Sequence, residues 1–182
     1  RVEKQVANDL GGHLTFNSGA GDEKADGRVP QRFKRVDGKI QESGEQAFRI
    51  ENKTTGAQSY TLRGQDWEIV WFTAAKYGEI PLFHIQLDTM RDPLDLIVFP
   101  WQWGNDVLVR TFGESIAALP QKTVSLNKKS WLAYERRIAE TTPAAFVPTW
   151  DMHLVSGINK THHLMLCRYQ ALRQRLSLSG DP

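Results

Sequence analysis

The sequence predicts an α/β fold in which helices flank a mixed central β-sheet, and three neighbouring segments predict it. Residues 48–55 alternate apolar and polar side chains, as a β-strand does. Residues 67–77 carry large apolar side chains at helical spacing, and Gly78 follows as a helix end. Residues 80–87 are rich in β-branched and aromatic side chains, which is typical of a central strand. The chain has 182 residues, 40% of them hydrophobic, so we expect one core and a single domain.

The first element we expect along the chain is a short amphipathic helix. Val2, Val6 and Leu10 recur every four residues, and Gly11-Gly12 follows as the helix end. Glu3 lies on this helix, off its apolar stripe. The first helix therefore offers one carboxylate that its packing does not require.

A glycine-rich segment and an acidic residue come next. Residues 18–21 read Ser-Gly-Ala-Gly, where the backbone can turn sharply and approach a ligand closely. Asp26 directly precedes a short run that favours a β-strand. We therefore expect Asp26 at the start of a strand that follows a tight turn.

The strand at residues 48–55 pairs a carboxylate with an ammonium, because side chains alternate between its two faces. The side chains expected to face the core are Phe48, Ile50 and Asn52. Those expected to point away from it are Arg49, Glu51 and Lys53. Glu51 and Lys53 would supply an oxygen ligand for a hard divalent cation beside a fixed positive charge, which phosphodiester hydrolysis needs. A solvated strand edge with a cross-strand ion pair explains the same triplet.

The second half of the chain is predicted more coarsely. Residues 94–103 are strongly apolar and predict a strand, with residues 106–112 as its hairpin partner across Gly104-Asn105. Residues 128–139 predict a helix, which Ser125 or Asn127 would cap. Residues 160–176 predict a final basic amphipathic helix that carries Cys167 on a buried face.

The order of the features in the first half resembles the PD-(D/E)XK nuclease superfamily, and within it the Holliday-junction-resolvase-like group. The residues that carry the resemblance are Glu3, Ser18-Gly19-Ala20-Gly21, Lys24-Ala25-Asp26, Ile50-Glu51-Asn52-Lys53-Thr54-Thr55, and the helix at 67–77 before the strand at 80–87. Ala25 stands where the family usually has a proline. The resemblance implies a restriction-endonuclease-like core over residues 1–90, with residues 91–182 as a C-terminal extension packed on it.

The resemblance also implies a metal-dependent deoxyribonuclease. Asp26 and Glu51 would hold one Mg²⁺, for which Mn²⁺ can substitute, and the backbone carbonyl of Asn52 would be a further ligand. Lys53 would orient or deprotonate the attacking water, or stabilise charge in the transition state. Glu3 would help to bind metal or water, or is simply an acid favoured near a helix N-terminus. These four side chains and one carbonyl are the candidate catalytic and metal-binding groups.

DNA is the expected partner, and several polar side chains are candidates to contact it. Ser18 resembles a phosphate-contacting position in resolvases, although it is equally explained as a turn residue, and Lys24 is either a phosphate contact or solvated. The basic residues between Asp26 and the strand at 48–55 include Arg28, Arg32, Lys34, Arg35 and Lys39. Such residues can follow phosphates, or serve solubility alone. The net charge of +2 neither demands nor excludes nucleic acid.

Branched DNA such as a Holliday junction is the substrate that the resemblance favours, and two symmetric nicks would require a homodimer. A restriction-type or mobile-element nuclease on duplex DNA is the alternative enzyme. A non-catalytic nucleic-acid-binding module on the same fold is the alternative from another class, and an unrelated partner-binding α/β domain with exposed tryptophans is a third. Stacking of Trp101, Trp103 and Trp150 on unpaired bases would suit a nucleic-acid partner, but large aromatic side chains also build cores.

Other chemistries find less support in the sequence. Five histidines and one cysteine form no zinc-ligand spacing, and His84 fits the core of its strand. Neither a phosphate-binding Gly-x-x-x-x-Gly-Lys-Ser/Thr loop nor a Gly-x-Ser-x-Gly elbow is present. The lone Cys167, the lack of a signal peptide and the lack of a long apolar run favour a cytoplasmic protein without a membrane partner.

Overall fold

The computed structural model describes residues 13–14, 27–29, 33–36, 39–42, 46–108 and 111–178, with side chains described for residues 46–108 and 111–176. The chain divides into two compact units. Unit 1 comprises residues 1–52 and 69–82, and unit 2 comprises residues 53–68 and 83–182. Three elements contribute to both units, namely β5 (Phe48–Thr54), α2 (Gly64–Tyr77) and β7 (Ile80–Leu87).

Unit 1 contains an antiparallel arrangement built on β5. The strand β2 (Gly27–Val29) pairs with both β5 and β1 (His13–Leu14), and both pairings are antiparallel. A separate antiparallel pair joins β3 (Phe33–Val36) to β4 (Lys39–Glu42). The helix expected at residues 2–10 lies outside the described residues.

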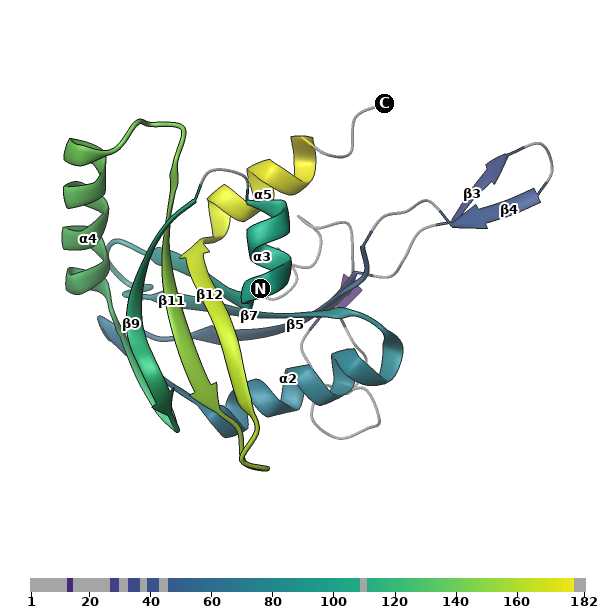
Figure 1. Cartoon of the computed structure of the whole chain (residues 1–182), viewed down its shortest axis with the longest axis horizontal. Helices are drawn as coiled ribbons and strands as arrows, with labels where there is room; N and C mark the ends of the chain where they lie inside the picture. Colours follow the sequence, from purple (N-terminus) through teal and green to yellow (C-terminus); the bar gives the residue numbers. More distant parts are fainter. Residues whose placement is uncertain are drawn as a thin grey trace. The chain divides into compact units, whose positions relative to one another are not determined.

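Unit 2 contains a mixed sheet. Across it lie the end of β5, the part of β7 from Phe83, then β8 (Leu94–Pro100), β12 (Thr161–Arg168), β11 (Val147–Val155) and β9 (Thr111–Gln121). β8 is antiparallel to β7 and to β12, whereas β9 and β11 run parallel. Figure 1 shows β9, β11 and β12 side by side. A smaller antiparallel pair joins β6 (Ser59–Arg63) to β10 (Thr123–Asn127). The α/β class with a mixed sheet and flanking helices is therefore confirmed.

Helices cover both faces of the sheet in unit 2. Trp150 pairs directly with Leu166, so the two side chains share a face, and Met165 points to the opposite one. On the Trp150 face lies α4 (Lys128–Thr141), whose Trp131 ring is 4.9 Å from the Trp150 ring. On the Met165 face lies α3 (Trp101–Val107), where a Cβ added to Gly104 would sit 3.1 Å from the Met165 sulfur. The core of unit 2 fills the two layers between these helices and the strands.

Several predicted elements are confirmed closely. β5 and β7 lie where the alternating and apolar runs place them, and α2 ends before Gly78, whose φ of 67° is the left-handed conformation of a helix end. The helix α4 begins at Lys128, and the Asn127 side chain accepts a hydrogen bond from the Ser130 N–H at 3.2 Å. Asn127, rather than Ser125, is therefore the cap.

Two predictions for the second half are wrong. Residues 160–176 are not one helix, because residues 161–168 form β12 and only then does α5 (Tyr169–Leu178) begin. Cys167 is buried as expected, but on a strand. The strand expected at residues 94–103 ends at Pro100, and α3 occupies the place of the predicted hairpin turn. No helix in the part of the chain described here is long and apolar enough to cross a membrane.

Candidate functional site

The strand β5 carries the candidate pair Glu51 and Lys53. Both residues are partly exposed, while Asn52 between them is only 5% exposed. These three residues therefore alternate between solvent and core as predicted. The strand is long enough at seven residues to hold both charged side chains within regular structure.

Arg49 is an exception, because the prediction that it points away from the core beside Glu51 and Lys53 is wrong. Its side chain is fully buried, and its Nε donates a hydrogen bond to Glu79 Oε2 at 2.7 Å. The guanidinium also lies over the Tyr77 ring, 5.1 Å from the ring centroid. Phe48, Arg49 and Ile50 are all buried, so this part of β5 is covered on both faces. In a strand that is covered on both faces, alternating apolar and polar residue types do not indicate which side chains are exposed to solvent.

The pairing of β2 with β5 relates Asp26 to Glu51. Gly27, the first residue of β2, lies opposite Ile50 in the antiparallel register. Asp26 is the residue before Gly27, and Glu51 is the residue after Ile50. Because antiparallel strands run in opposite directions, the chain enters β2 from the end towards which Glu51 lies. Asp26 itself lies outside the described residues.

The structure describes the other predicted site residues only in part. Those outside the described residues are Glu3, Ser18, Lys24 and Arg32. Those described by their backbone alone are Arg28, Lys34 and Arg35. Arg28 lies in β2 opposite Arg49, and Lys34 and Arg35 lie in β3 opposite Gln41 and Ile40. The basic residues of the connection thus belong in part to a β-hairpin.

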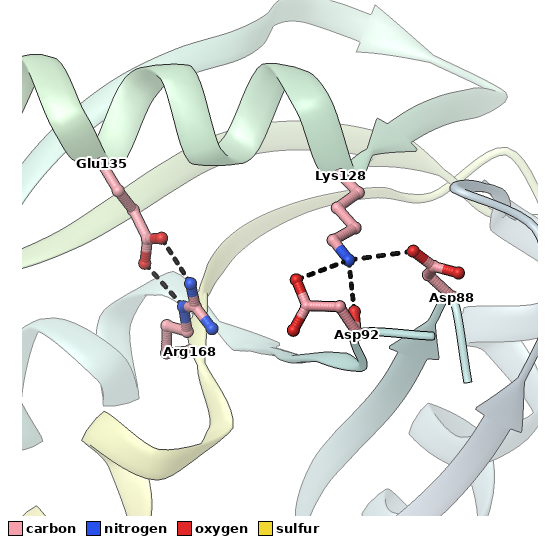
Figure 2. A network of polar contacts seen from close by, with 5 residues as sticks. All are labelled: Asp88, Asp92, Lys128, Glu135 and Arg168. Atoms are coloured by element: carbon pink, nitrogen blue, oxygen red, sulfur yellow. Dashed lines mark hydrogen bonds and ion pairs between the residues drawn. The ribbon is translucent and has the colours of Figure 1, made fainter. Parts of the chain in front are cut away.

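A polar network, which the sequence reasoning missed, joins the buried residues Asp88 and Lys128 to the exposed Asp92 in unit 2. The Lys128 ammonium contacts Asp88 Oδ2 and Asp92 Oδ2, each at 3.0 Å, and the Asp92 carbonyl (Figure 2). Burial lowers the pKa of Lys128, but its hydrogen bonds to Asp88 and Asp92 outweigh burial and raise that pKa above the ordinary value. Asp88 directly follows the apolar strand β7. A carboxylate at the end of a buried strand was the sequence signal from which this network could have been suspected.

A second ion pair on the same helix joins α4 to β12. Arg168 donates two hydrogen bonds of 2.7 Å from Nε and a terminal nitrogen to the two carboxylate oxygens of Glu135 (Figure 2). This hydrogen bonding is the main cause that raises the pKa of Arg168. Arg168 was expected on the final basic helix at residues 160–176, but it ends β12 and is held by Glu135.

His84 is a core residue, as expected. It is 1% exposed, its Nε2 lies 3.3 Å from Asp95 Oδ1, and its ring packs edge-on against Tyr169. The hydrogen bond with His84 lowers the pKa of Asp95, although burial opposes the shift. His84 therefore serves the interior of unit 2.

Three rings stack in a column near the start of α3. The Trp101 ring stacks on His163 at 4.7 Å, and the His163 ring stacks on His153 at 4.3 Å. Trp101 Nε1 donates a hydrogen bond of 3.2 Å to Asp151, whose pKa is raised by burial. Trp150 is 5% exposed and packs against Trp131, so it is a core side chain rather than a surface for unpaired bases.

Within the described ranges, no group of three or more His, Cys, Asp or Glu side chains lies close enough together to hold a metal ion. The predicted ligand set includes Asp26, which is outside these ranges. No protein-family model and no curated protein matches the chain.

Proposed function

We propose that the chain is a Mg²⁺-dependent DNA endonuclease that hydrolyses phosphodiester bonds, with branched DNA such as a Holliday junction as substrate. One observation carries the proposal: Gly27 pairs with Ile50, so the predicted ligands Asp26 and Glu51 are the next residues beyond the same antiparallel pair. This register agrees with the arrangement that two strands must have if their carboxylates share one cation.

The chemistry of the donors fits Mg²⁺. Asp26 and Glu51 would supply carboxylate oxygens, and the Asn52 main chain would supply a carbonyl oxygen; Mg²⁺ prefers such ligands. Glu51 is partly exposed, as a residue that binds a hydrated ion beside a phosphate would have to be. When bound, the metal polarises the scissile phosphate and lowers the pKa of a coordinated water.

Lys53 would act on the attacking water or on the charge that develops at the phosphate. It follows Asn52, whose burial fixes β5 and keeps Lys53 on the same side of the strand as Glu51. Removal of such a donor typically lowers kcat by about 10²–10³-fold. Glu3 would support metal or water binding.

DNA would be held mainly through its phosphates. Ser18 and Lys24 precede Asp26 in the sequence, and Arg28, Arg32, Lys34 and Arg35 follow it in the segment that contains β2 and β3. Each phosphate that these cations neutralise would make affinity fall with salt. Two paired nicks in a junction would be made by the two active sites of a homodimer.

The test is the cleavage of labelled linear, flapped and four-way-junction DNA with Mg²⁺ or Mn²⁺. Glu51→Gln and Lys53→Met should lower cleavage at least about 10²-fold. Glu140→Gln and Lys129→Met, which change exposed residues of α4, are the matched controls and should cleave like the wild type. Preferential cutting of linear duplex would replace the junction substrate with a restriction-type one. DNA binding without cutting would replace the enzyme with a binding module.

A further inference from the structure

The loop that follows β5 is held at almost every residue by the rest of unit 2. Residues 55–58 connect β5 to β6. Four backbone hydrogen bonds fix this loop: Thr55 N–H to Gln86 O at 3.0 Å, Thr89 N–H to Thr55 O at 3.2 Å, Asp88 N–H to Ala57 O at 2.9 Å, and Lys128 N–H to Gln58 O at 2.8 Å. The loop begins two residues after Lys53, so its position determines where β5 ends.

Asp88 and Lys128 hold this loop by their backbones and hold each other by their side chains. The Lys128 Nζ to Asp88 Oδ2 contact of 3.0 Å joins two residues that are 7% and 5% exposed. Asp88 has a φ of 53°, a conformation that residues other than glycine seldom adopt unless their surroundings enforce it. The ammonium thus holds the turn after β7 in the shape that presents its N–H groups to the loop.

We propose that Lys128 and Asp88 are positioning residues for Lys53. This inference rests on the proposed function, since Lys53 is the residue that would act on the water or phosphate. The ion pair fixes the turn at Asp88–Thr89, the turn fixes the loop at 55–58, and the loop fixes the end of β5. Loss of the ion pair should therefore displace Lys53 without removing any of the proposed metal ligands.

The Glu135–Arg168 pair provides an internal control. Glu135 lies on the same helix as Lys128, and its pair with Arg168, which is partly exposed, joins α4 to β12 (Figure 2). Among the hydrogen bonds of the described residues, neither side chain of this pair bonds to residues 55–58. Replacing Arg168 should also loosen α4. A merely structural role predicts that the activity of each variant falls only as its folded fraction falls. A positioning role predicts a loss of kcat in folded Lys128→Met that folded Arg168→Met does not show.

The test compares Lys128→Met, Lys128→Arg, Asp88→Asn and Arg168→Met at a temperature at which circular dichroism shows each variant folded. We expect Lys128→Met and Asp88→Asn to lower kcat for DNA cleavage by about 10- to 100-fold with little change in KM. Lys128→Arg should recover most of this loss, and Arg168→Met should keep the wild-type kcat. Asn tolerates a positive φ, so Asp88→Asn tests the ion pair even if Lys128→Met does not fold. Equal kcat values for Lys128→Met and Arg168→Met would overturn the proposal.

Hydrogen exchange separates this inference from the proposed function. The backbone amides of residues 53–58 should exchange faster in Lys128→Met and Asp88→Asn than in the wild type. Their exchange rates should be unchanged in Arg168→Met. If the wild type cuts no DNA, the proposed function fails, and this measurement alone decides whether the ion pair positions the end of β5. Unchanged exchange of these amides in Lys128→Met and Asp88→Asn would refute the positioning.

Discussion

Replacement of Arg49 should destabilise the protein far more than a typical substitution of a charged residue. The Arg49 and Glu79 side chains are both 0% exposed and their charged atoms are 2.7 Å apart. Arg49→Met would leave the Glu79 carboxylate buried without this cation, and breaking a buried ion pair in this way costs about 3–5 kcal/mol. For a chain of 182 residues that corresponds to a fall in Tm of about 6–20 °C.

A double-mutant cycle isolates the ion pair. Arg49→Met with Glu79→Met replaces both charges by apolar side chains, and such replacements are often neutral or stabilising. We therefore expect the double variant to be more stable than either single variant. The control is Arg136→Met, an exposed arginine on α4, which should change the free energy of unfolding by less than about 0.5 kcal/mol.

Urea unfolding monitored by tryptophan fluorescence would measure these free energies of unfolding, and calorimetry would measure the Tm values. The reasoning is refuted if Arg49→Met costs less than about 1 kcal/mol. It is also refuted if the double variant loses the sum of the two single losses, because additivity is the behaviour of side chains that do not interact. Either result would mean that the ion pair with Glu79 contributes little to stability.

Three further predictions concern unit 2. Asn127→Ala removes the acceptor that caps α4 and should lower the free energy of unfolding by about 1 kcal/mol in urea titrations, with Asn127→Asp nearly neutral. Burial lowers the pKa of His162 and His163 from the ordinary 6.5, so the unfolded chain binds protons first and stability should fall as the pH drops below about 6.5. The difference between the urea midpoints at pH 7.5 and pH 5.5 should be smaller in His163→Gln than in the wild type. An unchanged difference would contradict this. Gly64→Ala would place a Cβ 1.7 Å from the backbone oxygen of a β11 residue and should cost at least about 1–3 kcal/mol by calorimetry. In Gly56→Ala the added Cβ would lie 3.8 Å from its nearest neighbouring atom, so this control should not have that cost.

Local sequence patterns predicted the helix and strand around the candidate site well, because each of these elements has one clear short-range pattern. Apolar spacing and Gly78 predicted α2, and the run at residues 80–87 predicted β7. The run at residues 161–168 was misread, because five of these residues are buried, four of them in succession, and such a run has no alternation to distinguish it from a helix. Gly104 was misread as a turn residue, whereas its missing side chain lets α3 approach Phe99.

The candidate site was predictable where it depends on chain order and not where it depends on tertiary contacts. Glu51 and Lys53 stand two positions apart on a strand, and this spacing is visible in the sequence. Lys128 and Asp88 are separated by 40 residues, so only the folded chain brings them together. Arg49 joins Glu79 across 30 residues for the same reason.

The central claim is that Asp26 and Glu51 hold one divalent cation between them. Isothermal titration calorimetry with Mn²⁺ would test it in the wild type, Asp26→Asn and Glu51→Gln, with Asp66→Asn on α2 as control. The account predicts one cation per chain in the wild type and the control, and loss of that binding in both site variants. Undiminished binding in either site variant, or no binding by the wild type, would contradict it.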